Sequence, residues 1–551
     1  GNGTKKTTRI MIAFYQNWRL FLIITFFVLA FGGVITRMIM IQTNQGLFLQ
    51  SAGNAQNQSI REISVKRGTI FDRNGTPLAI SITGFDLFAL SGLEKKDFEK
   101  LFQVIDLEKS FADINTSKKS LIQKNLTFEE QRKVLELQID RIELEKTYTR
   151  HYPMGEQIAP LIGFSGRDQY GLEGLEKSFN SLLAGKVGSE KILKDVYGRP
   201  LDHIEILEPS IASKDLHISI DSNIQYIAYK HLIQSIKTQQ ATAGTVVILD
   251  NATKQVLALA SYPSYNPNSP QRKIQKNRVF LETYEPGSIV KPIARAGVLE
   301  QNLLAIDDEM EVPIKITVDG NIINDRKQYG SLKVYEIIQE SSQVGATKIA
   351  LLAGRDLMIE NYQRFGFSKP IHINFPSAGF GDINTKDDMT DIEVATLGYG
   401  YGLTASPFQI AQAYAVFANE GIYHDYQLVL DEMSSQYHAP IISKQTADDV
   451  LTALYCVTTD GTGKLANVKG FSIAGKTGTT EKLQGGNYKS STYTSSFVGI
   501  GPDQGNTITI FVNIDNLGAN RYSGGQVAAP LFQKIATDVY AYLGYFEDND
   551  I

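Results

Sequence analysis

The stretch YEPGSIVKP at residues 284–292 combines a turn signal with two side chains that can do chemistry. Pro286-Gly287 predicts a turn, and the residues after it predict the start of a helix. Ser288 and Lys291 are three residues apart, so a helix would place both on one face, roughly 5–6 Å apart at Cβ. A serine hydroxyl becomes nucleophilic when a base accepts its proton, and a neutral lysine can be that base. The stretch alone is a weak signal, so partner residues must be sought elsewhere.

Two later stretches supply candidate partners for this pair. Ser341-Ser342-Gln343 lies between predicted helices, and Lys476-Thr477-Gly478-Thr479 lies on a probable strand. A free lysine has a pKa of about 10.4. Lys291 therefore needs burial and a second cation, for which Lys476 is the candidate, to be neutral at pH 7. Each motif is weak by itself, but the ordered trio within one part of the chain is a strong signal that the three stretches form one site.

Composition narrows the class of protein. The chain has 551 residues, enough for two or three domains, with 42% hydrophobic and 21% charged residues, as is usual for globular proteins. A net charge of −5 without a basic stripe argues against nucleic acid as a partner. The single cysteine, Cys456, cannot form an internal disulfide, and the seven histidines lack metal-binding spacing. We therefore expect no metal and no cofactor.

The N-terminal part predicts a membrane anchor. Residues 20–36 carry no charge, and the apolar run continues to residue 41, about 33 Å of helix, which spans a bilayer core. Basic residues precede the run and the first acid is Glu62, so the start of the chain should be cytoplasmic and everything after residue 42 outside. A cleavable signal peptide is the alternative, but the run is long and no cleavage site follows it.

The order of predicted elements indicates an α+β fold. Asn74-Gly75 predicts a hairpin turn, and residues 93–149 have the spacing of a small helical subdomain. Residues 243–250 and 255–260 predict a hairpin, strands return after residue 470, and a helix begins at Ala528. Strands at both ends with helices between them predict one sheet covered by helices. The expected segments are a cytoplasmic tail (1–19), a transmembrane helix (20–41), a connector (42–59), a non-catalytic pedestal (60–212) and a catalytic domain (213–551).

The chain resembles the class B penicillin-binding proteins, and within them the septal cell-division transpeptidases (penicillin-binding protein 3) of Gram-negative bacteria. Beyond the three motifs, the similarity includes residues 67–79, 150–153, 171–176, 262–268, 398–403 and 522–525. It implies a single transmembrane helix, an elongated N-terminal pedestal or dimerisation-like domain, and a C-terminal penicillin-binding transpeptidase domain. That domain would be serine β-lactamase-like, with a central antiparallel sheet.

The resemblance also implies a reaction and a role for each motif residue. Ser288 would attack the penultimate D-Ala of a peptidoglycan stem, and Lys291 would accept its proton. Ser341 would relay a proton to the leaving amine, and Lys476 would be the second cation. The substrate-binding residues would be Gln343, Thr477, Gly478 and Thr479, with the backbone N–H groups of Ser288 and Thr479 forming the oxyanion hole. A β-lactam should acylate Ser288.

One position departs from the family. Asn is usual at the third position of the middle motif, where this chain has Gln343. The extra methylene moves the amide by about 1.5 Å, and a misplacement of about 1 Å can cost about 100-fold in rate. The role of Gln343 is therefore open at this point.

The resemblance leaves several functions to be separated. The first is a septal D,D-transpeptidase in the bacterial inner membrane, with its catalytic domain in the periplasm. An elongation-type relative, a β-lactamase or D,D-carboxypeptidase, and a non-turnover β-lactam-binding scaffold or sensor are the alternatives. The implied partners are peptidoglycan stem peptides (a D-Ala-D-Ala donor and an amine acceptor), β-lactam antibiotics, the lipid bilayer, a membrane glycan polymerase and other division proteins.

Overall fold

The computed structural model describes residues 18–45, 57–166, 168–195, 200–269, 271–376, 378–430, 437–484, 487–503, 506–518 and 523–545. These residues form two compact units, each built from more than one segment of the chain. Unit 1 comprises residues up to 65, 83–147 and 186–211, and unit 2 comprises 66–82, 148–185 and 212–551. The predicted division at residue 213 stays a prediction about domain organisation.

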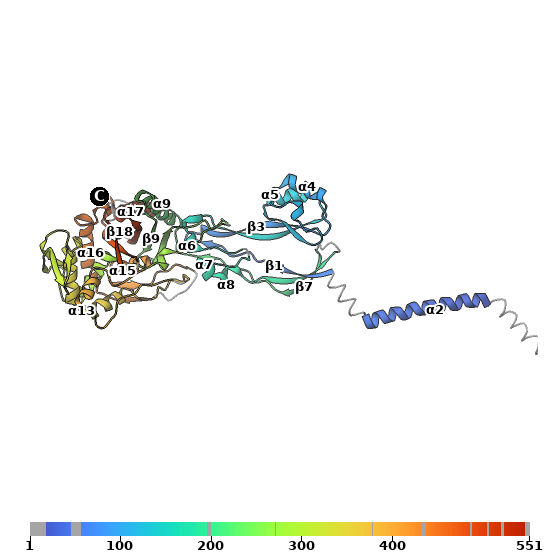
Figure 1. Ribbon diagram of the computed structural model, residues 1–551, viewed down its shortest axis with the longest axis horizontal. Helices are drawn as coiled ribbons and strands as arrows, with labels where there is room; N and C mark the ends of the chain where they lie inside the picture. The colour runs from blue at the N-terminus through green and yellow to red at the C-terminus, as the bar shows by residue number, and fades with distance from the viewer. Residues whose placement is uncertain are drawn as a thin grey trace, which may run out of the picture. The chain divides into compact units, whose positions relative to one another are not determined.

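The apolar run near the N-terminus is a single helix. It is α2 (Trp18–Met40), and it continues into a short π-helical turn at Ile41–Gln45 (Figure 1). The 26 residues Trp18–Thr43 are long and apolar enough to cross a membrane, and none of that segment is buried by other parts of the protein. This confirms the predicted helix and fits a single-pass membrane anchor. Most of the predicted connector at 42–59 lies outside the described residues.

Besides α2, the described part of unit 1 contains two small sheets and two further α-helices. Its strands are β1 (Gln58–Ile63), β6 (Gly188–Lys194) and β7 (Pro200–Glu208) in one antiparallel sheet, and β4 (Ser120–Leu126) and β5 (Ile142–His151) beside β3 (Pro77–Ala89). The two further helices are α4 (Lys95–Val104) and α5 (Phe128–Glu136). The predicted helical subdomain at 93–149 is therefore wrong in part. Ile122 and Leu126 are four apart, which suits a helix or a strand, and pairing of β4 with β3 decides for the strand.

Unit 2 begins with short elements that include the predicted hairpin. β2 (Ile70–Phe71) pairs antiparallel with the start of β3 and parallel with β8 (Leu216–His217). Gly75, in the turn, has φ of +82°, a value that glycine adopts without strain. The other elements here are a 3₁₀ turn (Gly155–Gln157), α6 (Ala159–Ile162), α7 (Gly174–Ser178) and α8 (Asn180–Ala184).

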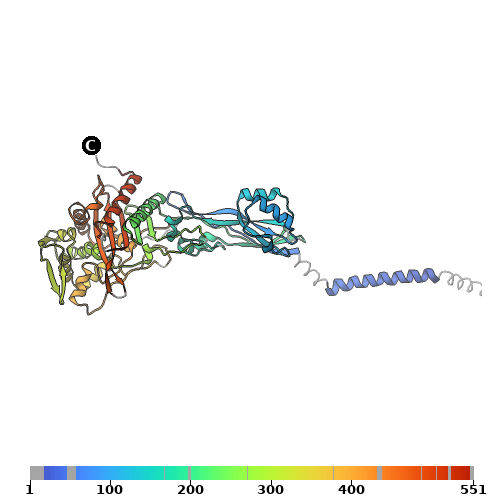
Figure 2. The same cartoon turned by 45° about the horizontal axis from the view of Figure 1, so that its top comes forward.

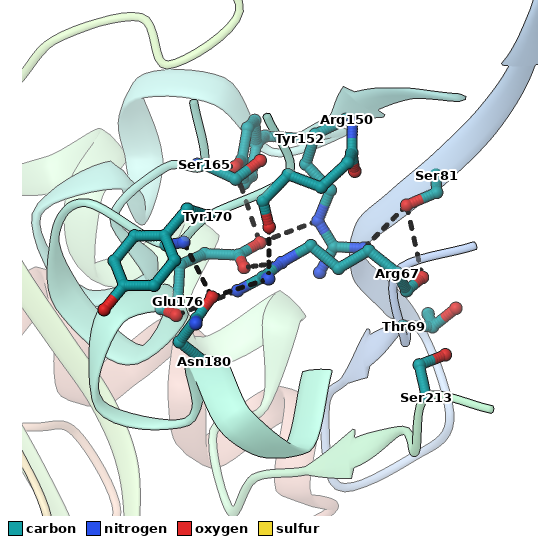
Figure 3. Close-up of polar contacts among 12 residues, drawn as sticks. Arg67, Thr69, Ser81, Arg150, Tyr152, Ser165, Tyr170, Glu176, Asn180 and Ser213 are labelled. Carbon is teal, nitrogen blue, oxygen red and sulfur yellow. Dashed lines mark hydrogen bonds and ion pairs between the residues drawn. The ribbon is translucent and has the colours of Figure 1, made fainter. Parts of the chain in front are cut away.

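A buried ionic cluster joins three distant segments within unit 2 (Figure 3). Arg67 Nε donates to Glu176 Oε2 at 2.6 Å and Arg150 Nε donates to Glu176 Oε1 at 2.7 Å. The side chains of Arg67 and Glu176 are 0% exposed and that of Arg150 is 3% exposed. Arg67 also donates to Gln169 O and to Asn180 Oδ1. One carboxylate thus compensates two buried guanidinium groups, and the cluster holds three of the family-like segments together.

The core of unit 2 is a five-stranded antiparallel sheet with strand order β10-β9-β19-β18-β17. Its strands are β9 (Ala243–Asp250), β10 (Gln255–Tyr262), β17 (Ala474–Gln484), β18 (Asn487–Gly501) and β19 (Ile508–Leu517). α9 (Ser222–Gln239) and α17 (Ala528–Leu543) lie side by side on one face (Figures 1 and 2). α15 (Pro407–Ala418) covers the other face, with α11 (Lys291–Glu300), α13 (Gln343–Arg364) and α16 (Lys444–Thr459) behind it. The predicted α+β fold with a helix-covered antiparallel sheet is confirmed.

Strand β9 shows why this sheet is a two-sided core. Val246 and Ile248 belong to the apolar cluster on the α9/α17 side, whereas Val247 and Leu249 belong to the cluster on the opposite side. Successive side chains of a strand point to opposite faces, so a strand between two helical layers reads as a continuous apolar run. β19 alternates in the same way.

The remaining elements are short or lie between the sheet strands. They are α10 (Arg278–Leu281), a 3₁₀ turn η4 (Gly287–Val290), β11 (Glu309–Val312), β12 (Lys315–Val318), β13 (Asn321–Asn324), β14 (Gly330–Lys333), α12 (Val334–Gln339), α14 (Asp391–Leu397), β15 (Ile422–His424) and β16 (His438–Pro440). Two further 3₁₀ turns are Phe111–Asp113 and Lys464–Ala466.

Candidate active site

Ser288 lies in the 3₁₀ turn that leads into α11, next to strand β17. Gly287, which precedes it, has φ of +60° and donates its N–H to Gly400 O at 3.0 Å. A Cβ added at Gly287 would lie 2.3 Å from Thr480 Cγ2. The turn therefore requires glycine both for its backbone conformation and for its close approach to β17. Ser288 and Lys291 are i and i+3 across this turn, as the spacing predicted.

Ser341 joins the two lysines of the predicted motifs. Lys476 Nζ donates to Ser341 Oγ at 2.9 Å, and Lys291 Nζ donates to Ser341 Oγ at 3.2 Å and to its carbonyl O at 2.5 Å. Both lysines are 0% exposed. Within the described chain Lys291 makes its hydrogen bonds to Ser341, and none to Ser288 Oγ. The three motifs thus converge from α11, the α12–α13 turn and β17.

The turn that carries Ser341 is held by an acid that the sequence analysis did not identify. Asp325 accepts hydrogen bonds from Ser342 Oγ at 2.5 Å and from the backbone N–H of Gln343 at 2.6 Å and of Val344 at 3.2 Å. A carboxylate at a helix N-terminus satisfies free N–H groups and complements the helix dipole. Ser341 itself has φ of +57°, an uncommon conformation for a residue with Cβ. Such strain is characteristic of functional turns.

The electrostatics of the lysine pair favour proton loss. Burial lowers the pKa of Lys291 well below its usual value, and the charges of Lys476 and then Arg295 lower it further. Burial, followed by Arg295 and Arg326, lowers the pKa of Lys476 to about 7. The positive charge of Lys476 is thus one physical cause of the lowered pKa of Lys291. A neutral Lys291 beside a partly charged Lys476 can accept a proton from a hydroxyl.

Five of the eight predicted site residues line one cavity of about 370 Å³. Its lining includes Ser288, Ser341, Gln343, Thr477 and Thr479, together with Asn324, Asp325, Arg326, Tyr329, Glu340, Thr462, Lys464, Leu465, Ser523, Gly525 and Gln526. A larger cavity of about 700 Å³ near the end of α16 contains none of the motif residues. The smaller cavity is therefore the candidate active site.

The β17 wall of the cavity is fixed by close packing. Thr477 Oγ1 and Thr462 Oγ1 are hydrogen-bonded at 2.9 Å, and Thr479 Oγ1 accepts from Gly524 N at 2.9 Å. A Cβ added at Gly478 would lie 3.3 Å from the Ile289 side chain. Gly478 thus lets β17 approach the turn that carries the serine, which explains the glycine of the Lys-Thr-Gly motif.

Gln343 is the first residue of α13 and lines the cavity. Its backbone N–H is bonded to Asp325, while its side-chain amide makes no hydrogen bond to the residues that the structure describes. The amide is therefore available to a ligand in the cavity, although it belongs to Gln rather than to the Asn that is usual in the family.

All eight predicted site residues belong to this one region. The residues that the sequence analysis missed are Asp325, Thr462 and Arg295, a buried arginine that donates to Lys291 O. None of the three belongs to a motif of its own. The sequence offered a signal for one of them, since Arg295 is the one charged residue in the apolar stretch that follows Lys291.

In this fold two buried lysines converge on Ser341 Oγ beside a cavity that Ser288 lines, an arrangement suited to serine acyl transfer. The chain belongs to the penicillin-binding protein family. The family described as the Penicillin binding protein transpeptidase domain matches residues 244–537, and the Penicillin-binding Protein dimerisation domain matches residues 62–218. The resemblance to class B penicillin-binding proteins is thereby confirmed, and the particular closeness to the septal members stays a prediction.

Relatives cover nearly the whole chain. It is 32% identical to the probable peptidoglycan D,D-transpeptidase PbpC of Pseudomonas aeruginosa over 547 residues, which cover 97% of each chain. It is 30% identical to the peptidoglycan D,D-transpeptidase FtsI of Escherichia coli K12 over 543 residues, covering 95% of this chain and 91% of that one.

Solved structures agree in fold. The transpeptidase domain of penicillin-binding protein 3 from Burkholderia pseudomallei aligns with a TM-score of 0.56 and 33% identity, covering 60% of this chain and 98% of that one. Penicillin-binding protein 3 of Mycobacterium tuberculosis, complexed with aztreonam, aligns with a TM-score of 0.69 over 89% of this chain and 98% of that one. At 23% identity the second likeness concerns the fold alone.

Proposed function

We propose that this chain is a serine-type peptidoglycan D,D-transpeptidase that crosslinks stem peptides during septal cell-wall synthesis. The observation that carries the proposal is the convergence of Lys291 and Lys476 on Ser341 Oγ, in the cavity that Ser288 lines. The names of the relatives from Pseudomonas aeruginosa and Escherichia coli support the same reaction. A β-lactam would acylate Ser288 in place of the stem peptide.

In the first half of the reaction the serine is acylated. Neutral Lys291 takes the proton of Ser288 Oγ, which attacks the carbonyl carbon of the penultimate D-Ala. The C–N bond to the terminal D-Ala breaks, and the departing amine receives a proton through Ser341, which is hydrogen-bonded to both lysines. The products are an acyl ester on Ser288 and free D-Ala.

In the second half an amine of a neighbouring stem replaces the serine. The acceptor amine attacks the ester carbonyl, loses a proton to the Lys291–Ser341 pair, and releases Ser288 with its proton restored.

Lys476 with the hydroxyls of Thr477 and Thr479 would hold the terminal carboxylate of the donor. Backbone N–H groups of Ser288 and Thr479 would form the oxyanion hole, a contribution of typically about 3–4 kcal/mol per donor. Gly478 would contribute to substrate binding through its backbone, and the free amide of Gln343 would bind a peptide amide.

The proposed setting is the bacterial inner membrane, with the catalytic domain in the periplasm. It is supported by the apolar helix α2 and by the basic residues before it, since positive charge favours the cytoplasmic side. A membrane glycan polymerase and other division proteins are the proposed partners. In α2, a Cβ at Gly32 or Gly33 would meet no other atom within 4 Å, so this small pair is open to a partner helix. Unchanged co-purification of the polymerase with Gly32→Leu would count against that contact.

The experiment that tests the reaction is labelling of the full chain in detergent with a fluorescent penicillin, followed by intact mass spectrometry. We expect a stoichiometric adduct on the native chain that persists for hours and is absent from Ser288→Ala. Thr253→Ala, a surface threonine in the β9–β10 turn, is the matched control and should label normally.

Three outcomes would overturn parts of the proposal. An adduct lost within seconds would indicate a β-lactamase, in which water releases the acyl group. A stable adduct without crosslinked product from lipid-linked precursor and a polymerase would indicate a binding scaffold or sensor. Labelling of the Ser288→Ala variant would show that the nucleophile is another residue.

A further inference from the structure

Arg295 lies one helical turn after Lys291 on α11 and is only 1% exposed. Its Nη1 donates to the carbonyl O of Lys291 at 2.8 Å. Its Nε and Nη2 are also buried, and neither has a hydrogen-bond partner among the described residues. No Asp or Glu in that part of the chain forms an ion pair with it. Arg295 is thus a buried cation behind the lysine pair without a compensating carboxylate.

The surroundings of Arg295 and Lys291 are rich in positive charge. The titratable or charged groups that face the two side chains are Tyr362 on α13, Tyr414 on α15, Lys476 on β17, and Asp325 and Arg326 in the loop before β14. α16 also packs on α11, and its polar contacts lie at the far end, where Glu300 accepts from Ser443 and Thr446. Among the described groups that act most strongly on Lys291, therefore, three are cations and one, Asp325, is a carboxylate.

The neighbouring tyrosines do not neutralise the guanidinium. Tyr362 and Tyr414 are fully buried, and their hydroxyls donate to the backbone oxygens of Leu397 and Ile289. Burial lowers the pKa of Arg295 to about 9, with the two tyrosines acting in the opposite direction, so the group is still protonated at neutral pH. An apolar side chain of similar length would fill the same space without the cost of burying an unpaired charge.

We propose that Arg295 is a positioning residue whose uncompensated positive charge keeps Lys291 neutral, and therefore able to accept the Ser288 proton, at physiological pH. Its hydrogen bond to Lys291 O also fixes the first turn of α11 behind the nucleophile. This inference rests on the proposed acylation of Ser288 and adds a residue that no motif of the chain includes. The direction of the Lys291 shift agrees, since Arg295 is among its main causes after burial and Lys476.

The test compares Arg295→Met, which removes the charge, with Arg295→Lys, which keeps it. The acylation rate of the full chain by a fluorescent penicillin is measured between about pH 5 and pH 10. The acidic limb of this profile reports protonation of the general base. Without the neighbouring charge Lys291 binds its proton more tightly, so the limb of Arg295→Met should move to higher pH. Each pH unit of movement lowers the rate at pH 7 about tenfold, and the rate should recover above the new limb.

The conservative variant and an independent control exclude a merely structural role. Arg295→Lys should keep the acidic limb near its native position. Arg355→Met, which removes an arginine bonded to Thr385 O and Lys386 O, should leave the profile unchanged. The melting temperature of Arg295→Met should equal or exceed that of the native chain, because a buried charge is removed.

An unmoved acidic limb in a folded Arg295→Met variant would overturn the inference. So would an equal loss of rate at every pH in both the Met and the Lys variants, since that result indicates packing rather than charge. If Arg295→Met does not fold, Arg295→Gln provides the same loss of charge with a polar side chain. Failure of the native chain to be acylated would refute the proposed function instead, so the two failures are distinguishable.

Discussion

Two groups of buried arginines in unit 2 differ in how their charge is compensated. Arg67 and Arg150 converge on Glu176, with N–O distances of 2.6 and 2.7 Å (Figure 3). The other Arg67 donors bind backbone and side-chain oxygens, and Arg150 Nη1 binds Ser81 Oγ, whereas Arg150 Nη2 has no partner among the described residues. Arg295 is equally buried, but one N–H group binds Lys291 O and the rest of its buried donors have no partner among the described residues. Similar burial of the same residue type thus occurs with and without a carboxylate.

The difference separates a structural use of charge from a chemical one. A shared carboxylate lets two guanidinium groups tie together segments that are far apart in the sequence, and its value depends on complete pairing. A cation without a carboxylate does not join segments in this way, but its electric field shifts the pKa of any titratable neighbour. At the active site that field favours a neutral lysine. We therefore expect changes at Glu176 to affect folding and changes near Arg295 to affect protonation.

The largest expected effect is at the paired site. Glu176→Gln leaves two buried guanidinium groups without their carboxylate, and removal of one partner from a buried ion pair costs about 3–5 kcal/mol. Denaturant unfolding of the full chain should show this loss. Glu129→Gln, which removes one side of an exposed pair with Lys133, should cost less than about 1 kcal/mol.

A triple replacement sharpens the interpretation of that result. If the cost comes from uncompensated charge, then Arg67→Met and Arg150→Met combined with Glu176→Leu should recover most of the lost stability. A triple variant as unstable as Glu176→Gln would show that the geometry of the hydrogen bonds, rather than charge balance, stabilises the cluster.

The next largest expected effect is a pH dependence of stability that comes from Lys476, near Arg295. The pKa of Lys476 is about 7 in the folded chain and 10.5 as its ordinary value, so between these pH values the folded chain binds fewer protons than the unfolded chain. The contribution of Lys476 to the free energy of unfolding is therefore least favourable below pH 7. It improves as pH rises toward 10.5, by up to about 1.4 kcal/mol per pH unit.

Lys476→Met should remove this dependence. Urea unfolding at pH 7 and pH 9 should show a smaller gain in stability with pH for the variant than for the native chain. Lys230→Met, at an exposed position of α9, is the control and should follow the native chain. An identical slope in Lys476→Met and the native chain would contradict a lowered pKa for Lys476.

The smallest effect tests whether charge is what matters near Arg295. Tyr414→Phe removes a neutral hydroxyl that donates to Ile289 O, and loss of such a hydrogen bond costs about 1 kcal/mol. Thermal unfolding should register this loss, while the acidic limb of the acylation profile should stay in place. A limb that moves as far as in Arg295→Met would show that general disturbance of the site, not charge, shifts the profile.

The sequence predicted the sheet and the motifs because their signals are local. The run at β9 is apolar without interruption, the Pro286-Gly287 turn precedes the serine, and the hairpin at Asn74-Gly75 has its own turn residues. The prediction of a helix failed at residues 120–126, because the spacing of the apolar residues there fits both the helical and the strand period. Pairing with β3 makes this segment a strand. The sequence analysis also missed Asp325, whose role depends on a loop returning to the start of α13.

From sequence alone one could predict the long apolar N-terminal helix, the α+β order of elements and the candidate serine and two lysines, because each depends on composition, periodicity or short spacing. Only the tertiary structure decided which charges are compensated. Arg67 is paired because Glu176, 109 residues later, folds onto it. Among the described residues Arg295 has no carboxylate partner, because α13 and α15 place tyrosines beside it. Pairing depends on distances of a few ångströms between segments remote in the sequence, and neither the periodicity nor the composition of a chain encodes such distances.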